Sequence, residues 1–348
     1  MMDLRKDKMA GRITIAELAN LAEVSVSTVD RMLNGRHPVR RATAEKVLAA
    51  AEASGFYATR LLKERLGVGR PKVKLGFLLQ QSNRTFYRLI ADAIRLAAED
   101  ASPPAQIHIE HMDDLSPEHI AGRMLAMGGL VDALAVVSAE HPRITHAVET
   151  LAADGVTTFG LISALTAACG TGYVGLDNWK VGRTAAWALA GLCHRPGRIG
   201  ILVGNHRYRC QEMNESGFRS YFREHAPDFT LLEPVSTFED KAIARDVTET
   251  LLQREPDLVG LYIAGGGITG AMAAMADAGR AKGLVTVGHD LTSHTRGGLM
   301  DGLLTMVLAH PVSRLASEAV AAMTEAAQGK GPPGQRLLGF DIFTSENI

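Results

Sequence analysis

Residues with side chains that can read nucleic acid recur at helical spacing near the N-terminus. Val26, Ser27, Asp30 and Arg31 would lie on a mostly outward face of one short helix. Hydroxyl, carboxylate and guanidinium groups contact base edges, and an apolar side chain can meet a thymine methyl group. Such a helix, preceded by a second short helix and a tight turn, forms a helix-turn-helix that can enter the major groove. An ordinary helical hairpin is the alternative.

A glycine-rich stretch is the second place where the residue types suggest chemistry. The run from Gly265 to Gly270 has G-x-G-x-x-G spacing, and Asp290 follows twenty residues later. A strand expected before it and a helix expected after it complete the pattern of a dinucleotide-binding loop. The run lies in the last quarter of the chain, however, where too few strands follow, and glycines are common in turns at strand ends. An NAD-binding enzyme is therefore kept only as the alternative interpretation.

Other patterns for catalysis or metal binding are weak. The chain contains no G-x-S-x-G motif, no P-loop and no arrangement of Cys and His that suggests a nucleophile. His108, His111 and His119 lie near acidic residues, but their spacing mixes strand and loop, which favours solvated surface residues over a metal site. We therefore expect a protein that is not an enzyme and that has no cofactor and no bound metal.

Local signals define the helices that would carry the outward face. Thr14, with Glu17 three residues later, has the capping-box pattern of a helix start, and Ser25 can cap the second helix. A third helix is expected over 42–54 and would end at Gly55. The inward positions of the second helix are Val29, Met32 and Leu33.

From residue 73 onward, apolar strands alternate with helical segments. A β-α alternation that occurs twice predicts two lobes, each with a parallel sheet. The fold class is therefore α/β, with an all-α helix-turn-helix headpiece in front and a cleft between the lobes. The expected strands lie at 74–79, 107–111, 133–137 and 157–159 and, after the alternation restarts, at 199–203, 231–234, 258–264 and 284–289.

Composition and charge fit this division. The chain has 348 residues, 46% of them hydrophobic and 22% charged, which is typical of a globular protein with more than one domain. Residues 1–72 hold fourteen Lys/Arg and eight Asp/Glu, although the net charge of the chain is −1. A basic first part favours contact with phosphates.

Targeting signals and cysteine content indicate the cellular compartment that we expect for this chain. No run resembles a signal peptide or a membrane span, so we expect a cytoplasmic protein without membrane contact. Cys169, Cys193 and Cys210 are too few and too scattered for a disulfide framework or a zinc site. They are expected to be small buried residues in a reducing compartment.

The segment from Thr14 to Phe56 closely resembles the DNA-binding headpiece of the lactose-repressor (LacI) family. The resemblance rests on the runs T-I-A-E-L-A, A-E-V-S-V-S-T-V-D-R-M-L-N-G and V-R-R-A-T-A-E-K-V, followed by G-F. Asp30 and Arg40 depart from it, because the family usually has Ser at both positions. An acid on a recognition helix repels phosphate, so Asp30 either points to a base donor such as a cytosine amine or is held by Arg31.

The rest of the chain is similar to the periplasmic-binding-protein fold that forms the effector domain of the same family. The resemblance implies a headpiece at 1–58, a hinge linker at 59–72 and an effector-binding domain at 73–348. One lobe would comprise about 73–160 plus 310–348, and the other about 173–290. In the family the linker forms a hinge helix that wedges a leucine into the minor groove. Arg65 stands at the matching position, so the neighbouring Leu66 is the candidate; a plain Gly/Pro linker is the alternative.

Resemblance and position together assign the site residues. The assigned contacts with the phosphate backbone are Thr14, Ser25, Thr28 and Asn34, and those with bases are Val26, Ser27 and Arg31. The effector, a sugar or polyol in a sugar-responsive branch of the family, would contact Asn83, Arg84, Phe86, Tyr87, Ser138, Asn214, Gly265, Gly267 and Asp290. Core packing is the alternative for the aromatic pair, and a solvated loop or a helix cap is the alternative for Asp290.

The resemblance also implies the partners. One headpiece covers half of a palindromic operator in double-stranded DNA, so two-fold symmetry implies a homodimer or a larger homo-oligomer. The chain is therefore expected to be an allosteric transcription regulator, most simply a repressor. Which sugar controls it stays open, because Asn214 stands where the family often has Arg and His310 where it usually has Gln.

Overall fold

The computed structural model describes residues 13–35, 39–66, 73–101, 104–280 and 283–348, which form two compact units. The first unit contains the N-terminal helices, and the second contains most of the α/β part of the chain, Lys74–Ala97 and Ile107–Ile348. Among the described residues, no helix has both the length and the apolar character needed to cross a membrane.

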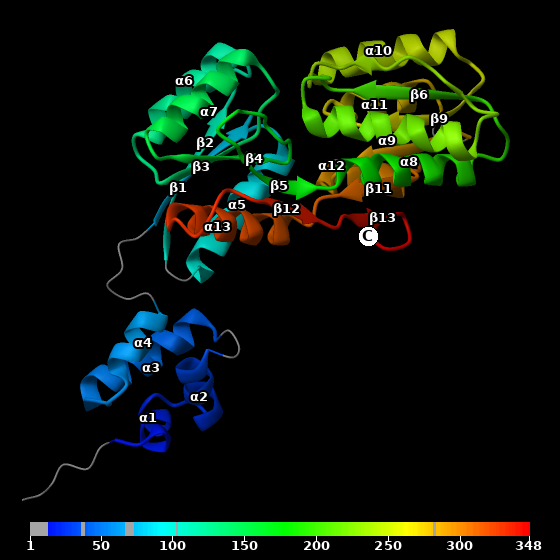
Figure 1. Ribbon diagram of the computed structural model, residues 1–348. Helices are drawn as coiled ribbons and strands as arrows, with labels where there is room; N and C mark the ends of the chain where they lie inside the picture. The colour runs from blue at the N-terminus through cyan, green and yellow to red at the C-terminus, as the bar shows by residue number, and fades with distance from the viewer. Residues whose placement is uncertain (1–12, 36–38, 67–72, 102–103, 281–282) are drawn as a thin grey trace, which may run out of the picture. The chain divides into compact units, whose positions relative to one another are not determined.

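The headpiece, which is the N-terminal part of the first unit, is built from helices (Figure 1). The predicted caps are confirmed: the backbone N–H of Glu17 donates to Thr14 Oγ1 over 3.2 Å, and that of Thr28 donates to Ser25 Oγ over 3.2 Å. Gly35 ends the second helix with a φ of 64°, a conformation that glycine adopts without strain. The helices are α1 (Ile15–Leu21), α2 (Val26–Asn34), α3 (Arg41–Ser54) and α4 (Thr59–Arg65).

The headpiece core draws on α4 as well as on the three expected helices. Leu18, Val29, Val47 and Leu62 are fully buried in one apolar cluster, and Leu62 comes from α4. The segment expected to be a linker from residue 59 is thus a helix packed on the headpiece up to Arg65. The difference arises because Leu62 finds an apolar site between α2 and α3, which local sequence signals do not reveal. Residues 67–72 lie outside the described part of the chain.

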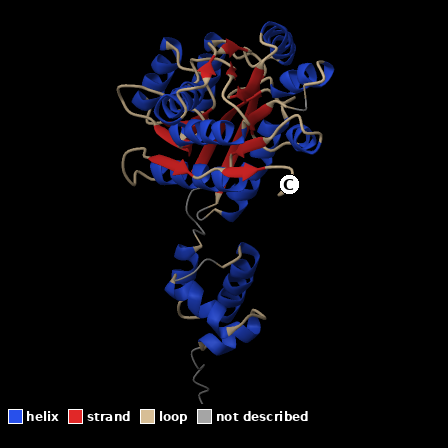
Figure 2. Ribbon diagram, turned by 90° about the vertical axis from the view of Figure 1, so that its right-hand side faces the viewer, coloured by secondary structure: helices blue, strands red, loops and turns tan. Residues whose placement is uncertain are grey.

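The second unit has two sheets, as the alternation of strands predicts (Figure 2). The first sheet has the strand order β12-β5-β4-β3-β1-β2, and its strands β12, β5, β4, β3 and β1 run parallel. Strand β1 is aligned with β3 so that Phe77 lies opposite Ala135. These strands are β1 (Val73–Gln80), β2 (Ala105–Met112), β3 (Ala133–Val136), β4 (Thr157–Leu161), β5 (Gly172–Leu176) and β12 (Gln335–Leu338).

The second sheet has the order β13-β11-β10-β9-β6-β7, with β8 paired to β6. Its edge strand β13 is antiparallel to β11, whereas β10 is parallel to both β11 and β9. These strands are β6 (Arg198–Val203), β7 (Thr230–Leu231), β8 (Val235–Ser236), β9 (Leu258–Ile263), β10 (Val285–His289), β11 (Met306–Ala309) and β13 (Asp341–Phe343).

Helices cover the sheets and bury their strands. In the first lobe α6 and α7 pack on one face through Met124 and Val148, while α5 and α13 lie on the other (Figure 1). Strands β3, β5 and β9 are buried along their whole length, as expected for strands covered on both faces. The helices are α5 (Thr85–Asp100), α6 (Pro117–Gly128), α7 (Pro142–Ala153), α8 (Asn178–Leu192), α9 (Arg209–His225), α10 (Lys241–Arg254), α11 (Ile268–Asp277), α12 (Ser293–Met300) and α13 (Val312–Ala327).

The division between the lobes differs from the expected one at two strands. Strand β5 belongs to the first sheet, although the second lobe was expected from residue 173, and β13 belongs to the second sheet, although it falls in the segment assigned to the first lobe. Strand β11, which also joins the second sheet, lies in the stretch 291–309, which was assigned to neither lobe. The chain therefore crosses between lobes after β5, after β11 and after β12. Which sheet a strand joins depends on pairing between distant segments, and the alternation of helices and strands does not encode that pairing.

We expect Leu62→Ala to destabilise the headpiece by about 2–4 kcal/mol, because it removes a fully buried side chain and leaves a cavity. Native-state hydrogen exchange of the headpiece amides in the full-length chain measures this change. Leu61→Ala is the matched control, since Leu61 is 39% exposed and its loss should change stability by no more than about 0.5 kcal/mol. Equal protection in the two variants would show that α4 does not contribute to the headpiece core.

Candidate functional site

Helix α2 presents the two faces that its sequence predicts. Val29 and Met32 are buried at 0% and 8% exposure, whereas Val26 is 51% exposed and Arg31 is also exposed. An apolar side chain half open to solvent on a short helix is available for contact with a partner. The proposed recognition surface is therefore free within the headpiece itself.

Hydrogen bonds hold the polar side chains of this face in place. Ser25 Oγ lies 2.9 Å from Ser27 Oγ and 2.8 Å from Thr28 Oγ1. Arg31 donates from Nε to the Ser27 carbonyl over 3.1 Å and from Nη2 to Thr28 Oγ1 over 3.3 Å. A long side chain that is already ordered loses less conformational entropy when it binds.

The partner of Asp30 within the headpiece is Asn34, whereas Arg31 bonds to Ser27 and Thr28. Asp30 Oδ1 accepts a hydrogen bond of 2.8 Å from Asn34 Nδ2, one helical turn away. This bond leaves the negative charge of Asp30 in place. It also occupies the amide nitrogen that Asn34 would offer to a phosphate. Leu66, the candidate wedge, is partly buried against the headpiece core, so insertion into a minor groove would require its release.

The second candidate site is a cavity of about 520 Å³ in the α/β unit. Residues from both lobes line it, at the ends of strands and the starts of helices, which is where open α/β sheets bind ligands. Eight of the nine predicted effector contacts line the cavity: Asn83, Arg84, Phe86, Tyr87, Asn214, Gly265, Gly267 and Asp290. Ser138 lies outside the lining; it is 1% exposed and its hydroxyl donates to the Ala139 carbonyl over 3.0 Å.

Asp290 and His310 form a buried pair at one side of the cavity. Asp290 Oδ1 accepts from the backbone N–H of His310 over 3.1 Å and lies 2.8 Å from its Nδ1. Burial by itself would raise the pKa of Asp290, but the charge and the hydrogen bonds of His310 outweigh it and lower that pKa. The carboxylate is therefore ionised, and it orients the imidazole ring of His310, which lines the cavity, through Nδ1.

Three polar atoms in the cavity lining are buried without a hydrogen-bond partner among the described residues. They are Gln80 Oε1, Asn214 Oδ1 and His310 Nε2. A buried acceptor without a donor costs about 1–3 kcal/mol. Two of these atoms are amide oxygens, which accept hydrogen bonds, and the third is a ring nitrogen that can accept or donate, so the lining suits a ligand with hydroxyl groups, which do both.

The aromatic pair next to them is part of the lining and of the core at once. The ring centroids of Phe86 and Tyr87 lie 5.3 Å apart, and those of Phe86 and His310 lie 5.5 Å apart. Tyr87 is 8% exposed, and burial raises the pKa of its phenol well above the ordinary value. Tyr87 therefore packs in the core, whereas Phe86 is half-buried in the cavity lining.

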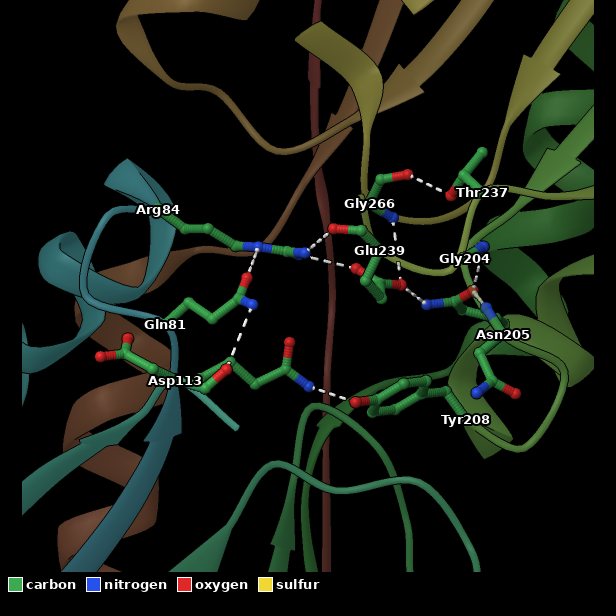
Figure 3. A network of polar contacts seen from close by, with 11 residues as sticks. Gln81, Arg84, Asp113, Gly204, Asn205, Tyr208, Thr237, Glu239 and Gly266 are labelled. Atoms are coloured by element: carbon green, nitrogen blue, oxygen red, sulfur yellow. Dashed lines mark hydrogen bonds and ion pairs between the residues drawn. The ribbon is translucent and has the colours of Figure 1, made fainter. Parts of the chain in front are cut away.

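A polar network joins the two lobes across the cavity (Figure 3). Arg84 at the start of α5 contacts Glu239, which follows β8, with Nη1 2.7 Å from Oε2. Glu239 Oε1 accepts from Gln211 Nε2 over 2.6 Å and from the Gly266 N–H over 3.2 Å. Deeper in the cleft, Gln80 Nε2 of the first lobe donates to the Tyr208 hydroxyl of the second over 2.6 Å.

The sequence did not reveal several members of this network. Glu239 lies in a turn whose residues Phe238 and Glu239 have φ values of 50° and 61°, a conformation usually marked by Gly or Asn. Tyr208 precedes α9 in a loop without a motif. Gln80 could have been found, because it is a polar residue that directly follows the apolar run from Leu75 to Leu79 at the end of β1.

Comparison with known proteins agrees with this geometry. Residues 14–58 match the family of bacterial regulatory proteins, lacI family, and residues 75–331 match the periplasmic binding protein domain. The chain belongs to the periplasmic binding protein domain family, whose model spans most of it, and its headpiece matches the lacI family. It is 27% identical over 214 residues to an uncharacterized HTH-type transcriptional regulator in the aml 5' region of Streptomyces limosus. That alignment covers 60% of this chain and 58% of the relative, less than two thirds of the relative's length.

Solved structures similar to this chain share the fold of its α/β unit. A solute binding protein from Agrobacterium vitis, bound with α-D-tagatopyranose, has a TM-score of 0.72 at 20% identity and covers 80% of this chain and 96% of its own. A periplasmic solute binding protein from Actinobacillus succinogenes 130z with bound D-allose also has a TM-score of 0.72 at 20% identity, covering 79% and 99%. These similarities establish the two-lobed fold.

Close packing accounts for the glycine-rich run. A Cβ on Gly265 would lie 2.3 Å from the Gly204 nitrogen, and a Cβ on Gly270 would lie 2.0 Å from the Lys241 carbonyl oxygen. Gly267 has a φ of 89°, which favours glycine. These contacts explain the motif without a dinucleotide, and the comparisons give no support to the NAD-binding alternative.

Neither histidines nor cysteines form a further site. Within the described ranges, no three or more His, Cys, Asp or Glu side chains are arranged to hold a metal ion. Glu110 pairs with Arg123 over 2.6 Å, and His111 Nδ1 lies 2.9 Å from the Gln80 carbonyl. Cys169 is exposed, contrary to the expectation that all three cysteines are buried, because it lies in the loop between β4 and β5.

We expect the free energy of unfolding to decrease as the pH falls from about 6.5 to about 4. Burial lowers the pKa of His289 from 6.5 to about 4, and Tyr262 Oη lies 2.9 Å from its Nε2. Only the unfolded chain binds the proton in this pH range, so stability is lost as the pH falls, by at most about 3 kcal/mol. The lowered pKa of Asp290 acts below this range.

Urea unfolding at a series of pH values measures this dependence. His289→Gln keeps an acceptor for Tyr262 but cannot bind the proton, so it should flatten the slope between pH 6.5 and 4. If the variant keeps the full slope of the original chain, another group causes it.

Proposed function

We propose that this chain is a DNA-binding transcription regulator whose affinity for its operator is controlled by an uncharged sugar or polyol in the cleft. The observation that carries the proposal is the combination of two sites in one chain. One is an outward helix face with an exposed Val26 and an ordered Arg31. The other is a polar cleft whose lining has buried acceptors without a partner among the described residues.

DNA binding would use α2 as the recognition helix in the major groove. Val26 would meet a thymine methyl group and Arg31 a guanine edge, while Thr14, Ser25 and Thr28 would contact phosphates. Asn34 would join them once its bond with Asp30 is exchanged for one to DNA. A homodimer would place two such helices on the half-sites of a palindromic operator.

The cleft chemistry supports a ligand rich in hydroxyl groups. A hydroxyl can donate to Gln80 Oε1 or Asn214 Oδ1 and can either donate to or accept from His310 Nε2, and Phe86 can pack against a ring. The solute binding proteins of the same fold with bound tagatopyranose and allose carry sugars of this kind. The effector would control DNA affinity by binding the two conformations of the regulator with different affinities.

We expect Arg31→Ala to weaken specific operator binding at least tenfold, because a bidentate contact between arginine and guanine contributes about 1–3 kcal/mol of discrimination. Fluorescence anisotropy would measure it with an operator selected from random DNA by the original chain. Arg143→Ala is the control, since Arg143 is an exposed arginine on α7 of the effector domain. Unchanged affinity in Arg31→Ala would exclude α2 as the recognition helix in this form.

We expect Asn214→Leu to weaken sugar binding at least tenfold while leaving thermal stability equal or higher. The substitution keeps the number and branching of the side-chain heavy atoms and removes a buried acceptor that has no partner among the described residues. Thermal shift and calorimetric titration against a panel that includes D-tagatose, D-allose and several polyols provide the measurement. Asn20→Leu, at an exposed position in the headpiece, is the matched control and should bind the sugar as the original chain does. If no compound in the panel binds the original chain, the effector class is wrong.

A further inference from the structure

We propose that Glu239 is an internal ligand of the cleft, whose carboxylate fills a binding site for anions and thereby restricts the effector to uncharged molecules. This inference takes the cavity as the effector site, as in the proposed function, and adds the residue that selects against charge. The position of the Glu239 side chain supports it. Glu239 is 8% exposed at its side chain and lines the cavity together with Arg84 and Gly266.

The groups around the carboxylate form a complete site for an anion. Arg84 approaches one oxygen, with Nη1 2.7 Å from Oε2, and also donates from Nη2 to the Glu239 carbonyl. The other oxygen, Oε1, accepts from Gln211 Nε2 over 2.6 Å and from the Gly266 N–H over 3.2 Å. A guanidinium group combined with backbone and amide N–H donors is the usual environment of a bound carboxylate or phosphate.

The glycines around the site are necessary for it. A Cβ on Gly204 would lie 1.7 Å from Glu239 Oε1, and a Cβ on Gly266 would lie 1.9 Å from Oε2. Either side chain would displace the carboxylate. The start of α11 follows at Ile268, so the positive end of its helix dipole lies close to the same charge. Backbone and side chains are thus shaped around an anion that the chain itself supplies.

The turn that delivers the carboxylate is strained. Phe238 and Glu239 both have positive φ values, 50° and 61°, and Phe238 is 65% exposed, so it gains little from packing. Strain of this kind persists only where surrounding contacts compensate for it, and it is common at binding sites. Here the bonds of the Glu239 carboxylate provide the compensation.

Charge in the cleft then decides which ligands can enter. Burial alone would lower the pKa of Arg84, but the charge of Glu239 and its hydrogen bond raise that pKa above the ordinary value. The guanidinium is therefore fully ionised and already paired. Of the other charged groups that line the cavity, Asp290 is paired with His310, while Asp240 and Lys241 have opposite charges. An anionic ligand would meet the Glu239 carboxylate and would have to compete with it for Arg84.

The Arg84–Glu239 pair also connects the two lobes across the cleft. Arg84 belongs to the first lobe and Glu239 to the second, so their contact joins the lobes together with the Gln80–Tyr208 hydrogen bond and the bond from the Glu140 N–H to the Arg207 carbonyl, 2.8 Å long. An uncharged effector can add its own hydrogen bonds without breaking this contact. An anionic effector would have to break it.

Replacing Glu239 by Gly tests the inference. Glycine adopts the φ of 61° without strain, and the substitution frees Arg84, Gln211 and the Gly266 N–H for an anion from solution. Calorimetric titration and thermal shift with sodium sulfate and inorganic phosphate, at constant ionic strength, should show binding at least tenfold tighter than in the original chain. The double variant Glu239→Gly with Arg84→Met should lose this gain.

Glu233→Gly is the matched control. Glu233 is 92% exposed at its side chain and lies outside the cavity lining, so this substitution removes the same charge without opening the anion site. An equal gain in this control, or a gain that survives in the double variant, would refute the role of Glu239. Tight binding of phosphate or of a sugar phosphate in the cleft of the original chain would refute it as well, and this result does not depend on any variant folding. Failure of every neutral sugar to bind would contradict the proposed effector class but leave the anion measurement interpretable.

Discussion

The ion pair between Arg84 and Glu239 is the contact on which the arrangement of the cleft depends. It crosses the cavity, and neither residue would be stable there alone, because an unpaired charge in a mostly buried site is far more costly than a paired one. Arg84 is held by the start of α5 and by Gln81, whose Oε1 accepts from its Nε over 2.8 Å. Glu239 is held by Gln211 and Gly266. The pair therefore ties two sheets together through residues that are themselves fixed by the ends of their helices and strands.

Other residues that line the cleft have polar atoms without a hydrogen-bond partner among the described residues. Gln80, Asn214 and His310 each have a buried polar atom that no other described residue satisfies, and these atoms lie around the cavity rather than in the core. A protein rarely keeps such atoms without a reason, since each reduces its stability. Their combination with the charge-paired residues gives a cavity that is polar but compensated in charge, a character that suits a neutral hydroxylated ligand.

One face of α2 packs on the headpiece core, and the opposite face is exposed. Val29 and Met32 anchor α2 to a core that also includes Leu18 and Leu62. The opposite face keeps Val26 exposed and its polar side chains linked to one another. Because the anchoring is apolar and inward, substitutions on the outer face can change what α2 reads without removing what holds it in place.

The sequence by itself determined the features that arise from local interactions. The capping box of Thr14 and Glu17, the inner and outer faces of α2 and the two-fold repetition of strands and helices follow from patterns within a few turns of chain, and the structure confirms them. Eight of the nine assigned cleft residues also line the cavity; most of them lie at strand ends or helix starts that a parallel sheet brings together, and Asn214 lies within α9. Tertiary structure alone decided which sheet β5, β11 and β13 join, the burial of Leu62 and the position of Glu239 opposite Arg84. Each of these results from contacts between segments far apart in the chain, for which neither periodicity nor a motif provides a signal.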